Sequence, residues 1–426
     1  MMRRERWQQI PSGMRDLLPD ESARARTITD GIISRMQRWG YHEVVTPTIE
    51  YFDTLVRGEG TEAGDRLFKL VDRGGELLAL RPEMTTPVAR LVTTHLRAQP
   101  LPLRLAYAGQ VFRGSETGSG RLREFPQVGA ELIGSDTLEA DAEIVALAVD
   151  ALAASGAVEC SVSLGHVGFL RGVLGALGLS EEGAAEVRAL LYQKDFVGLR
   201  AALDRYGVPA ARGDALMALP TLSGPHAIQE ARRVAETRET RGVLRDLEAL
   251  AEILEAYGVG GAVRVDLGII RDFDYYTGIV FEGHTAVLGF PLLGGGRYDR
   301  LLEGFGAPYP ATGFAVRVDR VLAASPSRDE EGGAADVAVA FTAEDRTEAL
   351  RLARALRERE LSVTVEILGR PWEEMARGAF AAGTPRAVLV TGGRAVVRDA
   401  DGHEQSVAVA DLLAGHPGNG SAPWAS

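Results

Sequence analysis

The sequence contains a single cysteine, Cys160, among 426 residues. This excludes an internal disulfide and any zinc or iron–sulfur site built from several cysteines, and one thiol fits a reducing compartment. There is no run of 18 apolar residues, and no apolar segment follows the basic residues 1–6 as in a secretory signal. We therefore expect a cytoplasmic protein with no membrane partner. Cys160 lies in an apolar alternation, which predicts a buried strand residue rather than a nucleophile.

Lysine is nearly absent, because Lys69 and Lys194 are the only two and arginine supplies the rest of the 47 basic side chains. Lysine-based covalent catalysis is disfavoured, since arginine stays protonated and cannot form a Schiff base. With 59 acidic residues, the formal net charge is −12. A nucleic acid would need a local basic patch against this mean field, so bulk binding of tRNA or DNA is disfavoured.

The chain also lacks the short motifs of ready-made sites, such as a Walker phosphate loop, G-x-S-x-G, H-E-x-x-H or C-x-x-C. Its seven histidines are widely spaced, which is more typical of surface or core residues than of metal ligands. The glycine-rich stretch 289–299 lacks dinucleotide spacing, and we expect it to allow close approach of the backbone to a ligand. We expect no metal and no cofactor.

The hydrophobic patterning predicts an α+β fold. A helix is expected over 20–40, where Ile28, Ile32 and Met36 recur at helical spacing. The stretch from about 165 to 257 has a helical pattern and is expected to form an insertion. Strand-like runs, expected to form an antiparallel sheet of hairpins, lie at 41–47, 67–71, 77–81, 103–113, 123–133, 262–270 and 276–283, and a helix-like run follows Phe314.

A second, smaller domain is expected after a linker at 324–335, whose residues are polar and small. Strand-like runs at 336–342, 361–368 and 386–391 alternate with helical patterns at 344–359 and 371–382, followed by a hairpin through 399–402. This alternation predicts a small α/β domain over 336–414 after a first domain over 1–325, with a disordered tail at 415–426.

Acidic, amide and arginine side chains occur within or at the ends of the apolar strand-like runs. Residues 127, 129 and 131 point to one face of a strand, so Gln127 and Glu131 flank Gly129, which leaves room for a ligand. Carboxylates there hold an amino group and arginines such as Arg81 and Arg113 hold a carboxylate, which together describe an amino-acid site. The alternative is structural ion pairing on an exposed sheet face, and the spacing alone does not separate the two.

At these residues the sequence resembles the histidyl-tRNA synthetase superfamily over about residues 10–325. Residues 11–19 look like the opening of that family. Residues 41–47 resemble class II motif 1, residues 112–131 resemble motif 2, and residues 313–320, which end in Arg320, resemble motif 3. Residues 271–276 and 294–299 resemble the two histidine-specific motifs. The resemblance implies a class II synthetase-like antiparallel sheet with flanking helices, and a homodimer formed through motif 1.

Within that superfamily the closer likeness is to the ATP phosphoribosyltransferase regulatory subunits, the synthetase paralogues of histidine biosynthesis. The segment 80–91, which reads LRPEMTTPVARL, is similar to the paralogue where a synthetase usually has Glu-Gly-Thr. Two departures from the synthetase bear on activity. Ser115 stands where motif 2 usually has the glutamate that helps to hold adenine, and Arg317 stands where motif 3 usually has a glycine beside the nucleotide. The resemblance therefore implies no catalytic residues in this chain.

The same resemblance implies a histidine-binding pocket. Glu83, Thr85, Gln127 and Glu131 are expected around the α-amino end of histidine, with Arg113 at its carboxylate. The other walls are expected to be Arg271, Tyr275 and Tyr276.

Three functions follow as hypotheses. The first is a non-catalytic regulatory subunit that senses L-histidine and controls a separate ATP phosphoribosyltransferase catalytic subunit within a hetero-oligomer, giving feedback inhibition. The alternative is an active histidine–tRNA ligase, and a third is a free-standing amino-acid binding module. From residue 336 onward the chain has ten arginines, no lysine and thirteen acidic residues, so its second domain favours a protein partner over tRNA.

Overall fold

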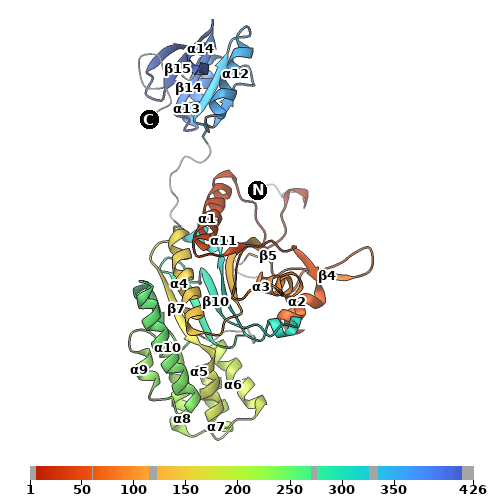
Figure 1. Ribbon diagram of the computed structural model, residues 1–426, viewed down its shortest axis with the longest axis vertical. Helices are drawn as coiled ribbons and strands as arrows, with labels where there is room; N and C mark the ends of the chain where they lie inside the picture. The colour runs from red at the N-terminus through yellow and green to blue at the C-terminus, as the bar shows by residue number, and fades with distance from the viewer. Residues whose placement is uncertain (1–5, 60, 115–121, 270–275, 326–333, 415–426) are drawn as a thin grey trace. The chain divides into compact units, whose positions relative to one another are not determined.

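The computed structural model describes residues 6–59, 61–114, 122–269, 276–325 and 334–414 (Figure 1). The chain divides into two compact units, Met1–Pro326 and Ser327–Ser426. Most of the linker expected at 324–335 and the tail expected at 415–426 lie outside the described residues.

The first unit is built on an eight-stranded sheet, and its architecture confirms the expected α+β fold. Its strand order is β1-β5-β6-β11-β10-β9-β7-β8, with parallel pairing only at the two outer pairs, β1 with β5 and β7 with β8. The strands are β1 (His42–Glu43), β5 (Leu103–Phe112), β6 (Glu124–Ile133), β7 (Cys160–His166), β8 (Val263–Val265), β9 (Ile279–Thr285), β10 (Leu293–Arg297) and β11 (Ala311–Arg317).

Helices cover one face of this sheet. They are α1 (Pro19–Arg38), α4 (Leu138–Ala154) and α11 (Val318–Ala324). Ile28, Ile32 and Met36 of α1 are buried against Val128 and Ala130 of β6, as the helical spacing predicted. The opposite face carries α3 (Thr85–Leu91) and a second core that includes Phe125 and Tyr107. Alternate residues of β6 therefore belong to different sides of the sheet.

The helical insertion follows β7 and returns to the sheet at β8 (Figure 1). Its helices are α5 (Val167–Ala176), α6 (Glu181–Gln193), α7 (Phe196–Arg205), α8 (Ala210–Ala218), α9 (Ala227–Ala231) and α10 (Arg238–Ala256). His166 ends β7 and caps α5, because its Nδ1 accepts a hydrogen bond of 3.0 Å from the Gly168 amide. Cys160, expected to be a buried strand residue, lies at the first position of β7 and is partly exposed.

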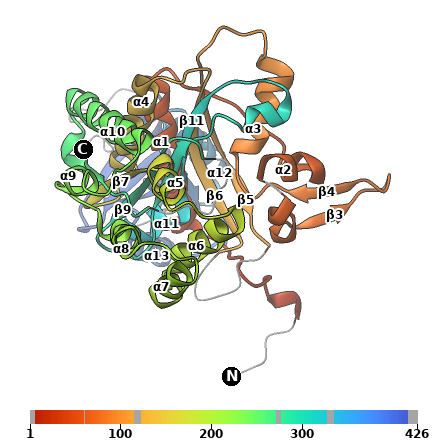
Figure 2. The same cartoon turned by 90° about the horizontal axis from the view of Figure 1, so that it is seen from below.

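A three-stranded sheet, β2-β4-β3, stands beside α2 (Phe52–Glu59), and its β3–β4 hairpin projects from the unit in Figure 2. Its strands are β2 (Ile49–Tyr51), β3 (Lys69–Val71) and β4 (Leu77–Leu80). The expectation of one sheet made of hairpins was thus wrong for these strands. The strand expected over 41–47 is also shorter, because the chain leaves β5 after Glu43 and turns toward the buried guanidinium of Arg81.

Glycine-rich β10 was not expected as a strand. Gly295 and Gly296 lie between β9 and β11, and a Cβ on either would collide with a backbone carbonyl and an aromatic ring of the protein itself. The glycines are thus required because the backbone of β10 packs closely against the protein itself, and not against a ligand as expected. The helix-like run expected after Phe314 begins only at Val318, because β11 extends to Arg317.

The second unit has a five-stranded sheet of order β13-β12-β14-β15-β16. Its helices and strands are β12 (Val337–Phe341), α12 (Arg346–Arg357), β13 (Val363–Val365), α13 (Trp372–Ala381), β14 (Arg386–Thr391), β15 (Arg394–Asp399), β16 (Glu404–Ala408) and α14 (Val409–Ala414). α12 and α14 pack on one face and α13 on the other. β13 is shorter than expected, and after it the chain forms a loop in which Glu366 pairs with Arg370 at 2.7 Å.

Candidate functional site: an amino-acid pocket on the central strands

Glu131 is the centre of a hydrogen-bonded group on the α3 side of β6. Its carboxylate accepts hydrogen bonds from the Thr85 hydroxyl at 2.9 Å, from the Tyr107 hydroxyl at 3.2 Å and from the Tyr298 hydroxyl. These donors come from α3, β5 and the residue after β10, and Glu131 is only 1% exposed. The carboxylate thus ties together three segments that are far apart in the sequence.

Burial raises the pKa of Glu131 from 4.5 to about 8. The negative charge of Glu83 acts in the same direction, while the hydrogen bonds from Tyr298, Thr85 and Tyr107 oppose it. Burial also raises the pKa of Tyr107 well above its usual range, and the carboxylate of Glu131 adds to this. Near neutral pH, therefore, Glu131 holds a proton that the approach of a cation would displace.

Gln127 lies four residues earlier on the same face of β6. Its side chain is buried, with the residue 5% exposed, and its Oε1 has no hydrogen-bond partner within the described residues. A buried acceptor without a partner costs free energy unless a ligand or water satisfies it. This amide oxygen and the Glu131 carboxylate are both acceptors, so they suit a ligand that donates, such as an ammonium group.

Gly129 separates Gln127 from Glu131, but it does not leave open room for a ligand as expected. A Cβ at Gly129 would collide with the Tyr107 hydroxyl and the Phe314 carbonyl, so the space above this glycine is already occupied. Gly313 on β11 lies opposite Glu131, and a Cβ there would collide with the carboxylate. The two glycines let Tyr107 and Glu131 lie close to the sheet.

Glu83 precedes α3 and is partly buried. Its carboxylate accepts hydrogen bonds from the backbone amides of Thr85 and, at 2.9 Å, Thr86. It thus caps the first turn of the helix that brings Thr85 to Glu131. The lone pairs that remain on a carboxylate bound in this way are available to a ligand.

Of the other expected pocket residues, Arg113 and Tyr276 are described. The Nε of Arg113 donates to the Pro82 carbonyl at 3.3 Å, which places Arg113 beside the segment that carries Glu83. Tyr276 is buried in the same core as Tyr107, with its ring against Gly296. Arg271 and Tyr275 lie outside the described residues.

The sequence did not point to Tyr107 and Tyr298 as members of this site. Tyr298 lies in the glycine-rich motif, and Tyr107 has the alternation of a core strand residue, so neither has a distinctive spacing. Arg81 has a different role from the one expected. Its buried guanidinium donates to the carbonyls of Thr46 and Pro47, and its Nε to the Gln110 carbonyl at 2.8 Å, so it fastens the chain after β1 to β5.

The neighbouring region, where a synthetase holds its nucleotide by resemblance, is occupied by Arg317. Its guanidinium carbon is 3.4 Å from the centre of the Phe125 ring. Two hydrogen bonds to the Asp319 carboxylate, at 2.9 and 3.2 Å, fix it there. Arg320 donates to the Pro291 carbonyl at 2.6 Å. The Arg317 side chain therefore fills one face of Phe125.

No metal centre was expected, and the described residues offer one group of possible ligands, Asp399, Asp401 and His403. They form the exposed β15–β16 turn, in which Asp399 accepts from the His403 amide at 2.8 Å. The three side chains therefore lie close together because they belong to one tight turn. Among the described helices, none has the length and apolar character needed to cross a membrane.

Comparison with known proteins places this geometry in a family. The histidyl-tRNA synthetase family profile matches residues 13–321. A curated ATP phosphoribosyltransferase regulatory subunit from Moorella thermoacetica is 43% identical over 376 residues, which cover 88% of this chain and 96% of the relative. Another, from Geobacter metallireducens, is 37% identical and covers 95% of both chains.

Solved structures agree. A crystal structure described as an ATP phosphoribosyltransferase regulatory subunit/histidyl-tRNA synthetase from Bacillus halodurans matches with a TM-score of 0.80 at 37% identity, covering 90% of this chain and 98% of the other. A histidyl-tRNA synthetase from Nostoc sp. PCC 7120 matches with a TM-score of 0.79 at 21% identity, covering 96% and 98%. The second likeness concerns the fold alone.

Proposed function

Because the chain belongs to the histidyl-tRNA synthetase family and, within it, to the ATP phosphoribosyltransferase regulatory subunits, we propose that it regulates a separate catalytic ATP phosphoribosyltransferase subunit in response to L-histidine. It is a non-catalytic subunit of the first step of histidine biosynthesis. Its lone cysteine supports a cytoplasmic location.

Histidine binding is supported most directly by Gln127, whose buried Oε1 has no partner within the described residues. In the proposed complex this oxygen and the carboxylates of Glu83 and Glu131 surround the α-amino end of histidine. Thr85 lies between the two carboxylates and bonds to both, through its backbone amide and its hydroxyl. Arg113 takes the carboxylate of histidine, with Arg271, Tyr275 and Tyr276 as the other walls.

The ligase alternative is disfavoured by the side chain of Arg317. A nucleotide that stacked on Phe125 from this side would have to displace a guanidinium that is bound to both the ring and Asp319. Histidine binding needs neither the ring nor this aspartate. The site therefore supports sensing of an amino acid without its activation by ATP.

Binding of tRNA by the second unit is also disfavoured. Of the ten arginines from residue 336 onward, six bond to side chains or carbonyls of the same unit; they lie at 354, 357, 359, 370, 394 and 398. Arg398, for example, pairs with both Glu373 and Glu404. Arginines that are bonded in this way, in a segment with more acidic than basic residues, form a poor binding surface for the phosphate backbone of a nucleic acid.

A homodimer through the motif 1 region is supported by apolar exposure beside β1. This strand lies at the edge of the large sheet, and Val45 just after it is 80% exposed. Ile49 and Tyr51 of β2 are also exposed. A sheet edge with exposed large apolar residues is a surface that proteins usually cover.

Reconstitution with the catalytic subunit from the same cell tests the proposal. The two purified chains should form a stable complex on size exclusion. Adding this chain should raise phosphoribosyl transfer from phosphoribosyl diphosphate to ATP, and histidine should suppress it only in the complex. A full-length Gln127→Leu variant should assemble but lose the response to histidine. If the catalytic subunit is fully active and equally inhibited alone, the proposed function is wrong.

A further inference from the structure

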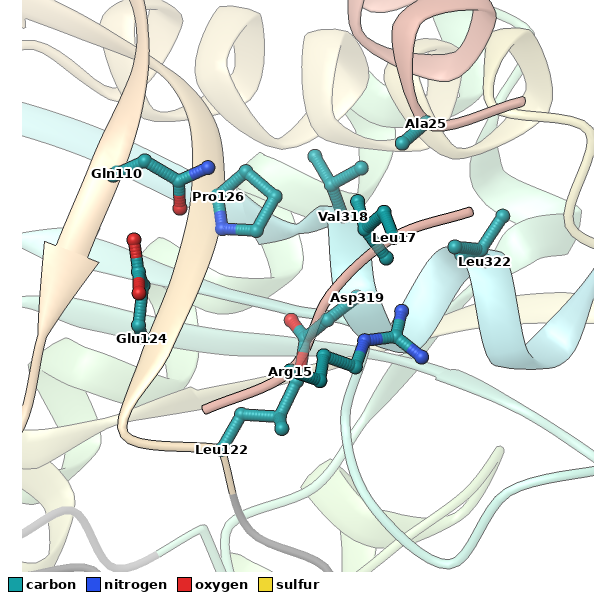
Figure 3. Close-up of a pocket in the computed structure, with 10 residues that line it drawn as sticks. All are labelled: Arg15, Leu17, Ala25, Gln110, Leu122, Glu124, Pro126, Val318, Asp319 and Leu322. Atoms are coloured by element: carbon teal, nitrogen blue, oxygen red, sulfur yellow. The ribbon is translucent and has the colours of Figure 1, made fainter. Parts of the chain in front are cut away.

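A second pocket lies on the other face of the central strands. It has a volume of about 210 Å³ and is formed where the ends of β5 and β6 meet α1, α11 and the segment before α1 (Figure 3). Its lining includes Gln110, Glu124 and Pro126, which alternate with the residues of the histidine site along the same strands. The two sites therefore open on opposite sides of the sheet.

The segment that opens the sequence forms one wall of this pocket. The Gly13 carbonyl accepts a hydrogen bond of 2.6 Å from the Arg123 amide, just before β6. Gly13 has a φ of 77°, and a Cβ there would collide with the Arg123 side chain, so glycine is required for this contact. The connection places Arg15 and Leu17 in the wall. Residues 11–19 thus form part of the second pocket, a role that is separate from the histidine site.

The pocket is lined by a carboxylate, an amide and a guanidinium that make few bonds to other side chains of the protein. Glu124 and Gln110 are diagonal neighbours on β6 and β5, and neither side chain has a hydrogen bond within the described residues. In Figure 3 these two side chains lie on one side of the pocket, while the Arg15 guanidinium lies on the opposite side, nearer Leu322. Arg15 pairs with Glu21 at 3.4 Å, an exposed contact that is worth little.

Asp319 also lines the pocket, but Arg317 already neutralises its charge. The remaining formal charges are one guanidinium and one carboxylate, with an amide beside the carboxylate. Apolar side chains, including Leu17, Leu122 and Leu322, make up most of the remaining lining. The volume is below the range of roughly 300–1,000 Å³ that is usual for larger ligands and cofactors.

We propose that this pocket binds a small zwitterionic amino acid. Arg15 takes its carboxylate, Glu124 and Gln110 take its ammonium group, and the leucines cover its carbon atoms. The pocket is separate from the proposed histidine site and does not depend on it.

Calorimetric titration of the full-length protein with single L-amino acids, histidine included, tests the proposal. At least one should bind saturably with a Kd below roughly 1 mM. Arg15→Gln and Glu124→Gln should each weaken that binding about tenfold or more, since each removes a charge-assisted contact. Glu21→Gln is the matched control, because it removes the ion-pair partner of Arg15 without altering the residues that line the pocket. This variant should bind the amino acid at least as tightly as the parent protein does.

The remaining variants distinguish the two sites. A Gln127→Leu variant should keep this binding while losing histidine at the other site. Ligand binding that Gln127→Leu removes, and that Arg15→Gln and Glu124→Gln leave unchanged, overturns the pocket proposal and supports the histidine site. Equal affinity for the amino acid and its carboxamide overturns the role of Arg15. Absence of saturable binding by any amino acid in folded protein, checked by circular dichroism, overturns the proposal entirely.

Discussion

The guanidinium of Arg317 lies over the ring of Phe125, with 3.4 Å between the guanidinium carbon and the ring centre. Asp319 holds the other side of this cation through two hydrogen bonds. A partly desolvated cation–π contact contributes about 2 kcal/mol. Any ligand that uses this face of Phe125 must offset at least this amount.

The first prediction concerns Arg317→Gly. Removing the guanidinium should strengthen ATP binding roughly 30-fold, the equivalent of about 2 kcal/mol. Histidine-dependent pyrophosphate exchange should remain at background in both proteins, because Ser115 is too short to replace the adenine-holding glutamate implied by the family and the α-phosphate stays misplaced. Calorimetry with ATP and an exchange assay check these outcomes. Exchange by the parent protein near the rate of a working synthetase would favour the ligase alternative.

The second prediction separates the two roles of Glu83. Glu83→Gln keeps one oxygen, which can accept from one of the two α3 amides that Glu83 binds, and it removes the charge. Histidine affinity should therefore fall about 10- to 150-fold, the equivalent of 1.5–3 kcal/mol. Glu83→Ala should lose the same affinity and also about 1 kcal/mol of stability with the helix cap. Calorimetry and thermal unfolding measure the two effects. Unchanged affinity in the glutamine variant would leave Glu83 as a cap alone.

A third prediction follows from the raised pKa of Glu131. The folded protein holds this proton up to about pH 8, whereas the unfolded chain releases it near 4.5. Between these values the folded state binds more protons, so the free energy of unfolding should fall as pH rises, by about 1 kcal/mol per pH unit from this group. Glu131→Gln removes the titration. Denaturant unfolding from pH 5 to 9 should show the parent losing stability relative to the variant, and a constant difference would contradict the assignment.

His166 gives a fourth prediction, of opposite sign. Burial, with Arg171 and Arg297 nearby, lowers the pKa of His166 from 6.5 to about 4. Between these values the unfolded chain binds more protons, so stability should be lost as pH falls, by up to about 1 kcal/mol per pH unit. His166→Asn keeps an acceptor for the Gly168 amide and removes the titration. Unfolding at pH 4.5, 5.5 and 6.5 should show a shallower acid loss in the variant, while equal slopes would place the acid-sensitive group elsewhere.

Local pattern was enough to predict some elements. The four-residue spacing of Ile28, Ile32 and Met36 predicted α1 to within two residues at each end, since a helix with one buried face imposes that spacing. Gly294, Gly295 and Gly296 have no side chains to alternate, so nothing in their sequence distinguishes a strand. They form β10 because β9 and β11 supply its partners.

The same limit applies to the site. The face shared by Gln127 and Glu131 follows from the two-residue period of a strand. That Tyr107 would lie against Gly129 depends on the register between β5 and β6, and that Tyr298 would reach Glu131 depends on a long-range pairing. Register is fixed by the packing of the whole sheet, so these two tyrosines could not be placed from local spacing.

The sheet order has a consequence for synthesis on the ribosome. β6 ends at Ile133, but its neighbour β11 begins only at Ala311, after the helical insertion has been made. At ordinary elongation rates, about 10 to 40 seconds pass between the two. During that interval the β5–β6 hairpin presents an unpaired edge, and Glu131 lacks Tyr298. Until β11 has been made, this edge of β6 is therefore open to pairing with a neighbouring chain.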